Sequence, residues 1–184
     1  MTYYGGKELA EAFRKVRKNT IQIAEDIPED KYGFKPSSES RSIAQTLAHI
    51  ATATTFPTML HGERIPIEKI DFNSYIQKVT TEETALQSKA QILAGLRDSG
   101  EKFAAMLEAL KDEAFLGEVI TFGPGAEPPS RTRFDMLLAA KEHEMHHRAQ
   151  LMVMQRMIGL VPHLTREAQE RMARFQAQQA QPAR

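Results

Sequence analysis

The chain has 184 residues, of which 41% are hydrophobic and 26% are charged, a composition ordinary for one globular domain. Its 24 basic and 24 acidic residues cancel, so it lacks the excess positive charge with which proteins bind a nucleic-acid backbone. It contains no cysteine, which excludes disulfides, thiolate nucleophiles, iron–sulfur clusters and cysteine-based zinc sites.

The distribution of apolar residues predicts a soluble, cytoplasmic protein. The first residues contain no apolar segment typical of a secretory signal. Unbroken apolar runs reach only four or five residues, far fewer than a membrane span needs. We therefore expect neither a membrane partner nor a nucleic-acid partner. We expect one domain over residues 1–175 and a flexible tail over residues 176–184, where glutamine and alanine predominate.

A first helix is predicted where apolar residues recur at spacings of three and four, from Leu9 to Ile27. Pro28 marks its end. Residues 30–40 contain glycine, proline and several serines, and this composition predicts a loop.

A second helix is predicted to begin after Ser42, because Ser42 and Gln45 have the spacing of a capping box. No Asp, Glu, Lys or Arg occurs from Ser42 to Leu60, and a charge-free helix in a globular protein is usually surrounded by other elements. Pro57 is expected to kink or end this helix. His61, Gly62 and Pro66 are expected to lead into a loop.

The next segments are predicted to form a third helix and a short strand. Thr80 and Glu83 have capping-box spacing, and apolar residues continue periodically to Leu110. Residues 118–122 are predicted to form a short strand. Residues 123–130 are rich in glycine and proline and are predicted to form a loop.

A fourth helix is predicted over residues 133–158, with Thr132 as its N-cap and Gly159 just beyond its end. Thr165 is expected to cap a fifth, more polar helix. These elements predict an all-α protein: a four-helix bundle with an extra C-terminal helix and at most one short strand or hairpin.

The fourth helix carries a histidine pair with the spacing of metal ligands. His143 and His147 are one turn apart and lie about 40° apart around the helix axis, whereas His146 points about 60° to the other side. Their face coincides with the apolar stripe of Met136, Ala140, Met154 and Ile158. Two buried neutral imidazoles at this spacing indicate a metal site. The alternative is a pair of core histidines bonded to carbonyls or water.

A third histidine strengthens the metal hypothesis. His49 is the only ionisable side chain of the charge-free second helix, so it too is expected to be interior. Together with His143 and His147 it predicts a mononuclear three-histidine site, a ligand set that suits Ni, Zn, Cu or Fe(II) rather than Mg or Ca. His61 and His163 adjoin glycine and proline and are expected to be plain loop residues.

Residues 143–147 also spell H-E-x-x-H, the zinc-peptidase motif, in which Glu144 would be the general base. Glu167 follows at a separation suited to a third zinc ligand. The extended motif of one peptidase class fails, because Gln150 and Val153 replace its glycine and histidine. The peptidase hypothesis therefore stays a minor alternative.

Two segments resemble the DinB family of small helical metalloproteins. Residues 27–51, IPEDKYGFKPSSESRSIAQTLAHIA, are similar to the family segment that ends in a metal-binding histidine. Residues 132–159, TRFDMLLAAKEHEMHHRAQLMVMQRMIG, are similar to its most recognisable stretch. The resemblance implies that His49, His143 and His147 are the metal ligands, the same residues that the helical faces select.

The resemblance also implies a four-helix bundle, often homodimeric, that holds a divalent metal, typically nickel or zinc. Characterised members include transferases and isomerases that use bacillithiol, mycothiol or glutathione. We therefore expect a metal-dependent transferase of a low-molecular-weight thiol to an electrophilic small molecule. The alternatives are a metal-dependent hydrolase, including a peptidase that uses Glu144, and a protein that binds a metal or ligand without turnover.

Apolar residues on the far side of the fourth helix predict self-association. Leu138, Met145 and Met152 recur every seven residues, almost opposite the histidine face. Either the fifth helix of the same chain covers this stripe, or a second copy of the chain does. The family resemblance favours a homodimer.

Overall fold

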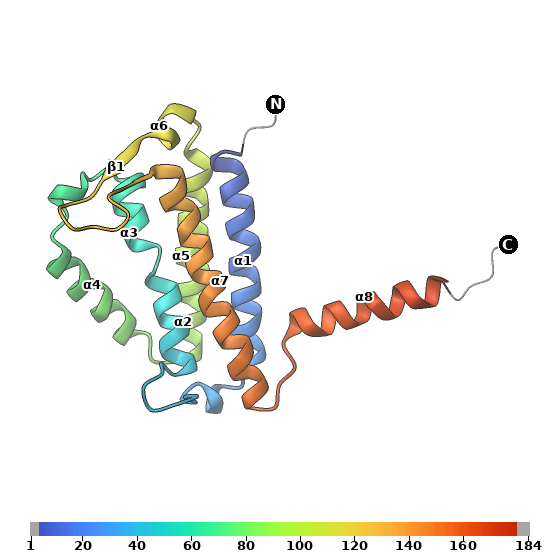
Figure 1. Ribbon diagram of the computed structural model, residues 1–184. Helices are drawn as coiled ribbons and strands as arrows, with labels where there is room; N and C mark the ends of the chain where they lie inside the picture. Colours follow the sequence, from blue (N-terminus) through green and yellow to red (C-terminus); the bar gives the residue numbers. More distant parts are fainter. Residues whose placement is uncertain (1–3, 180–184) are drawn as a thin grey trace.

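In the computed structural model, which describes residues 4–179, four helices form a bundle (Figure 1). They are α1 (Gly6–Asp26), α2 (Ile43–Thr52), α5 (Lys89–Ala109) and α7 (Arg133–Met157). Helix α1 packs on α5 and α7, and α2 packs on the same two helices, so the ring order is α1–α5–α2–α7. Helices α1 and α7 run in one direction and α2 and α5 in the other (Figure 1). The predicted all-α class and four-helix bundle are confirmed.

The local signals placed several helix ends correctly. Ser42 accepts a hydrogen bond from the Gln45 amide, and the Gln45 side chain accepts one from the Ser42 amide, which completes the capping box of α2. Thr132 caps α7 through the Asp135 amide. Gly159 follows α7 with φ +84°, a left-handed conformation that glycine adopts without strain.

The third predicted helix began in the wrong place. Residues 72–85 form a separate helix, α4 (Phe72–Ala85), which is capped by Asp71 and packs on α2. Thr80 lies inside α4, and α5 instead begins after Ser88, whose capping box uses Gln91. An i,i+3 Thr–Glu pair also occurs within helices, so its spacing alone did not identify an end.

The charge-free segment breaks earlier than Pro57. Helix α2 ends at Thr52, and a short α3 (Thr55–Pro57) and one π-helical turn, η2 (Thr58–Gly62), continue the chain. The remaining short turns are η1 (Glu29–Lys31), η3 (Ile67–Lys69) and α6 (Glu113–Gly117). The predicted strand is part of a small antiparallel hairpin, β1 (Val119–Thr121) with β2 (Ser130–Thr132), in which Ile120 pairs with Arg131.

The core consists of two groups of apolar side chains stacked along the bundle. One lies toward the α2 end and includes Ile23, Ile43, Leu47, Ile92 and Leu151. The other lies toward the hairpin and includes Phe13, Phe103, Leu107 and Leu137. Each such side chain contributes about 1.5 to 3 kcal/mol when fully buried.

A buried arginine ties the four bundle helices together. The Arg17 Nε on α1 donates to both carboxylate oxygens of Glu144 on α7, at 2.9 and 3.0 Å. Its other nitrogens donate to the Leu96 carbonyl and the Ser99 hydroxyl on α5, and to the Ile50 carbonyl on α2. The Arg17 and Glu144 side chains are only 4% and 3% exposed. This network fixes the rotation of α7 about its own axis.

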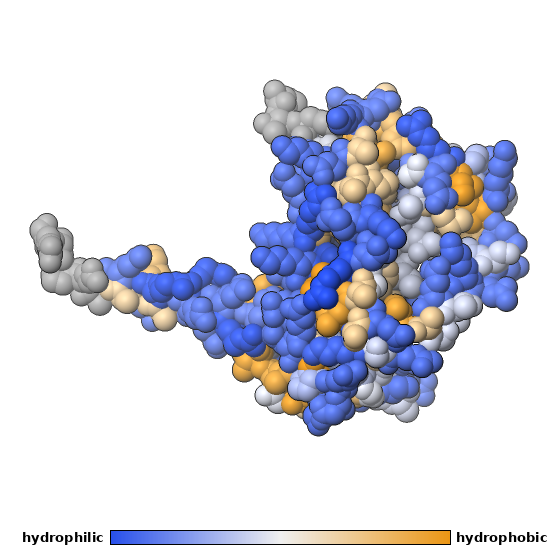
Figure 2. Space-filling model, turned by 180° about the vertical axis from the view of Figure 1, so that it is seen from behind, coloured by the Kyte–Doolittle hydropathy of each residue, from blue (hydrophilic) through white to orange (hydrophobic). Residues whose placement is uncertain are grey.

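The C-terminal helix α8 (His163–Gln179) extends away from the bundle (Figure 1). From the opposite side it forms a mostly hydrophilic arm (Figure 2). It begins two residues before Thr165, which is therefore not its cap. Residues 176–179 of the predicted tail continue α8, and residues 180–184 lie outside the described residues. The domain boundary at residue 175 stays a prediction. Within residues 4–179, no helix is both long and apolar enough to cross a bilayer.

Candidate metal centre

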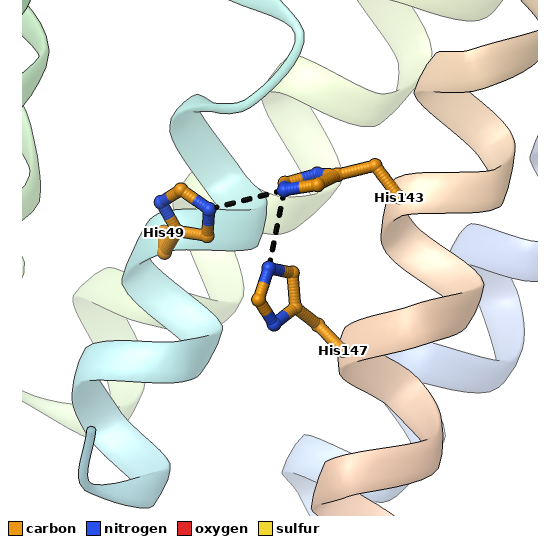
Figure 3. Close-up of side chains that lie close together, drawn as sticks. All are labelled: His49, His143 and His147. Carbon is orange, nitrogen blue, oxygen red and sulfur yellow. Dashed lines mark hydrogen bonds between the residues drawn. The ribbon is translucent and has the colours of Figure 1, made fainter. Parts of the chain in front are cut away.

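Three imidazoles meet between α2 and α7, as the sequence predicted. The His143 Nε2 lies 3.2 Å from the His49 Nε2 and 3.1 Å from the His147 Nε2 (Figure 3). One ligand atom from each residue lies within 4.8 Å of the others. His147 is buried, and His49 and His143 are partly buried. Nitrogen ligands about 2.0 to 2.1 Å from a tetrahedral zinc ion are about 3.4 Å apart, close to the two short separations.

The outer nitrogens of two of these rings are held by neighbouring side chains. The His49 Nδ1 lies 2.8 Å from the Glu83 Oε1, which also accepts a hydrogen bond from the Thr52 hydroxyl. The His147 Nδ1 lies 2.9 Å from the Gln150 Oε1. Because both partners are oxygen acceptors, both Nδ1 atoms carry the proton and both Nε2 atoms present lone pairs.

The three imidazoles cannot all be paired by hydrogen bonds to one another. The Nε2 lone pairs of His49 and His147 both face the His143 Nε2, which can carry a single proton and donate it to only one of them. A cation would engage all three lone pairs at once. The donor set, its convergence and its oriented outer nitrogens therefore fit a transition-metal ion.

The surroundings favour the neutral form of the rings that a metal requires. Burial, together with the nearby His147 and His49, lowers the pKa of His143 from 6.5 to about 4. Burial also lowers the pKa of His147, against the opposing effect of its bond to Gln150. The His143 and His147 rings are thus neutral near neutral pH, so a metal ion would have little competition from protons at these two ligands.

The geometry contradicts the peptidase hypothesis. Glu144, the required general base, points away from the histidines and is held by Arg17 in the bundle core. Glu167 lies on the projecting α8, 55% exposed and within 4.0 Å of Arg171. Neither carboxylate can serve the three-histidine site. His146, expected to point elsewhere, is exposed and contacts the Gln150 amide nitrogen.

The interpretation of His61 and His163 as plain loop residues was wrong. His61 is 1% exposed within η2, and His163 is 5% exposed in the first turn of α8. Burial, and secondarily the charge of Arg133, lowers the pKa of His61 to about 4. Each ring has one buried nitrogen with no partner among the described residues, Nε2 in His61 and Nδ1 in His163.

Two clefts flank the histidine cluster. One, of about 390 Å³, lies between residues 36–46 and α7 and includes Arg41, His147 and Gln150. The other, of about 340 Å³, lies among α2, α3, α4 and α7. Its lining includes His49 and His143, and its walls are mainly apolar. Helix α4, absent from the sequence prediction, supplies one wall of the second cleft.

Sequence reasoning missed three residues that organise this centre. Arg17 lies on the buried face of the first helix, where its neighbours around the axis are Ala10 and Ala24. No local sequence signal identified Glu144 as its partner. Glu83 was assigned to a capping box. Gln150 follows His147 by three residues, a spacing at which helical side chains meet, and this signal was available.

Comparison with known proteins agrees with this architecture. A model of the DinB superfamily matches residues 12–151. The uncharacterized protein YjoA of Bacillus subtilis strain 168 is 29% identical over 153 residues, which cover 83% of this chain and 90% of YjoA. The crystal structure of YjoA, described as a DinB-like protein, aligns with a TM-score of 0.61 at 25% identity. That alignment covers 83% of this chain and 92% of the YjoA chain.

The family match contains all three histidines and runs from Ala12 of α1 to Leu151 of α7, whereas α8 lies beyond it. With the bundle and its histidine cluster, this match identifies the chain as a member of the DinB superfamily.

Proposed function

We propose that this protein is a metal-dependent transferase that joins a low-molecular-weight thiol to an electrophilic small molecule. The observation that carries the proposal is the convergence of the His49, His143 and His147 Nε2 atoms between two clefts. A metal centre with an accessible cleft on each side suits a reaction that brings two molecules together.

The ligand set suits nickel or zinc as the native ion. When bound, such an ion supplies a Lewis acid that lowers the pKa of a thiol or water. Three neutral imidazoles leave its positive charge intact and leave coordination positions open. Glu83 and Gln150 support this role because they hold His49 and His147 in the tautomer that ligation needs.

The thiol must come from a second molecule, because the chain has no cysteine. Arg41 lies at the cleft that reaches His147, and none of the ion pairs within residues 4–179 involves Arg41. Bacillithiol, mycothiol and glutathione are the candidate thiols, and the two carboxylates of glutathione suit a guanidinium. The mainly apolar cleft beside His143 suits the electrophile.

The test is a screen of the nickel- and zinc-loaded protein with each thiol and 1-chloro-2,4-dinitrobenzene, monitored by thiol consumption and product absorbance. The proposal predicts turnover that a chelator abolishes, that metal restores, and that His49→Ala lacks. Ester hydrolysis without thiol would replace the proposal with a hydrolase. Absence of any turnover across the three thiols would favour a metal- or ligand-binding protein.

We also propose that the chain forms a homodimer through the outer face of α7. Met145 and Met157 are 40% and 54% exposed on α7, and α8 extends away rather than along this helix. Leu138 and Met152, the other members of the predicted stripe, pack partly against the chain's own core. Light scattering should give about twice 20.7 kDa, and Met145→Glu with Met157→Glu should give the monomer mass.

A further inference from the structure

One histidine that lines the second cleft has a buried ring nitrogen that the metal centre does not use. His61 lines this cleft together with His49 and His143. Its Nε2 is buried, with no acceptor among residues 4–179. A buried polar group without a partner costs free energy, so this one requires an explanation.

The protonation of His61 follows from its neighbour. The Arg133 Nη1 lies 3.3 Å from the His61 Nδ1, and a guanidinium can only donate. Nδ1 is therefore the acceptor, which places the ring proton on Nε2. Arg133 is itself fixed, since its Nε donates to Glu118 at 2.7 Å and its Nη1 to the Leu60 carbonyl at 3.1 Å. The guanidinium also stacks 4.5 Å from the centre of the Phe115 ring.

The rest of the cleft sets the kind of molecule that it accepts. Most of its other lining residues are apolar or aromatic, and they include Phe56, Tyr75, Val79 and Met136. The charged residue of the lining, Arg131, is paired with Asp135 at 2.6 Å. Such walls favour an apolar, often flat ligand, and a single buried donor favours one oxygen acceptor on it. His61 belongs to a π-helical turn, a local distortion that occurs frequently at functional sites.

We propose that this cleft binds the electrophile, an apolar molecule with a carbonyl or carboxylate oxygen. In this proposal the His61 Nε2–H donates a hydrogen bond to that oxygen. The inference rests on the proposed thiol transfer and adds the class of its second substrate. Because Nε2 is buried, the proposal requires the side chains that cover it to move aside when the ligand oxygen binds. His61 is then a binding and specificity residue beside the metal ligands.

A conjugated carbonyl shows what this donor would do chemically. When a thiol adds across the C=C bond, the sulfur electron pair forms the new C–S bond and the C=C pair shifts toward the carbonyl oxygen. The proton lost by the thiol is returned at the carbon next to the carbonyl, so no other reactant is consumed. A donor at that oxygen stabilises the charge that develops there.

Binding to the zinc-loaded protein tests the inference without thiol or turnover. The probes are cinnamamide and cinnamate, which carry the oxygen, and trans-β-methylstyrene, which does not. Nitrogen-15 NMR of labelled histidines should show the His61 proton on Nε2, and its resonances should move when cinnamamide is added. His61→Phe should weaken cinnamamide binding roughly three- to tenfold and leave β-methylstyrene unchanged. His61→Gln, which restores a donor, should recover most of the loss.

Two further variants complete the experiment. His163→Phe is the matched control, because His163 is also buried with an unpartnered nitrogen but lies outside this cleft; it should bind the probes as wild type does. If His61→Phe does not fold, Val79→Phe, which narrows the cleft from α4, should abolish binding of both cinnamamide and β-methylstyrene.

The inference is overturned if cinnamamide and β-methylstyrene bind alike, if neither binds, or if the His61 proton lies on Nδ1. Probe binding that is unaffected by Val79→Phe would also overturn it. A negative thiol-transfer screen together with His61-dependent binding would instead reject only the proposed transferase. Thiol transfer without His61-dependent binding would reject only this inference.

Discussion

Helix α7 carries two polar clusters on different faces, and they differ in how completely they are satisfied. On the α1 side, Glu144 receives two hydrogen bonds from Arg17, whose remaining nitrogens all bond to other helices. On the α2 side, three histidine nitrogens face one another with too few protons to pair. In the first cluster the protein itself supplies the hydrogen-bond partners, whereas in the second the facing lone pairs are all engaged only when a cation binds.

On this one helix, the first cluster therefore supports the fold and the second supports metal binding. The Arg17–Glu144 pair sets the rotation of α7, and that rotation directs His143 and His147 toward His49. Disrupting the Arg17–Glu144 pair should therefore change stability more than metal affinity. Removing the side chains that orient the histidines should change metal affinity more than stability. The following predictions run from the largest expected effect to the smallest.

Glu144→Gln should lower the free energy of unfolding by about 3 to 5 kcal/mol, because it leaves the Arg17 charge buried without its counterion. Urea denaturation measures this loss. Glu142→Gln, an exposed neighbour on the same helix, should change stability by less than about 0.5 kcal/mol. A Glu144→Gln protein of wild-type stability would show that the pair does not hold the bundle.

Glu83→Ala should weaken zinc affinity about 10- to 100-fold while changing stability little, because it removes the acceptor that orients His49. Competition with a chromogenic chelator measures the affinity. Glu82→Ala is the matched control, an exposed residue one position earlier on α4. Equal affinities in the two variants would argue against a role for Glu83 in the metal site.

Gly100→Ala should destabilise the protein although alanine favours helices. Its Cβ would lie 2.7 Å from the Arg17 Cγ, and Arg17 is held too firmly to move. Overpacking costs about 1 to 3 kcal/mol, and the gain in helix propensity, about 1 kcal/mol, offsets part of it.

The Cβ of Gly95→Ala on the same helix would meet two Leu86 methyl carbons at 3.4 and 3.5 Å and the Ala51 Cβ at 3.6 Å. These are ordinary van der Waals contacts, so the change should be neutral or stabilising by comparison. Thermal melts of the pair measure the contrast, and a Gly100→Ala protein more stable than Gly95→Ala would contradict the packing around Arg17.

His61 should make stability depend on pH. Its pKa is about 4 in the folded protein against 6.5 ordinarily, so the unfolded chain binds the extra proton and the folded state loses stability as the pH falls from 6.5 toward 4. The expected loss is about 1 kcal/mol between pH 7 and pH 5.5. Denaturation of wild type and His61→Phe at both pH values isolates this contribution, since the variant should lack it; parallel slopes would contradict it.

The sequence predicted those features that have a local signal. Ser42 with Gln45 and Thr132 with Asp135 identified two helix starts, because capping uses residues three positions apart. The histidine pair was identifiable for the same reason, since His143 and His147 share a helical face. His49 was predicted to be interior because its helix contains no charged residue.

What the sequence did not predict depends on contacts between distant segments. Arg17 and Glu144 are 127 positions apart, and Glu83 meets His49 across 34 positions. Glycine and proline beside His61 and His163 correctly indicated breaks in the chain. They did not indicate whether other elements pack over these positions. In the structure, His61 in η2 and His163 at the start of α8 are both buried.

The most direct test of the central claim measures metal stoichiometry and ligation in purified protein. Zinc- or nickel-loaded wild type should bind one ion per chain, and its X-ray absorption spectrum should show imidazole nitrogen as the dominant ligand. His49→Ala and His147→Ala should each lose stoichiometric binding, whereas His146→Ala should keep it. Stoichiometric metal in both His49→Ala and His147→Ala, or a shell dominated by carboxylate oxygen, would contradict the three-histidine centre.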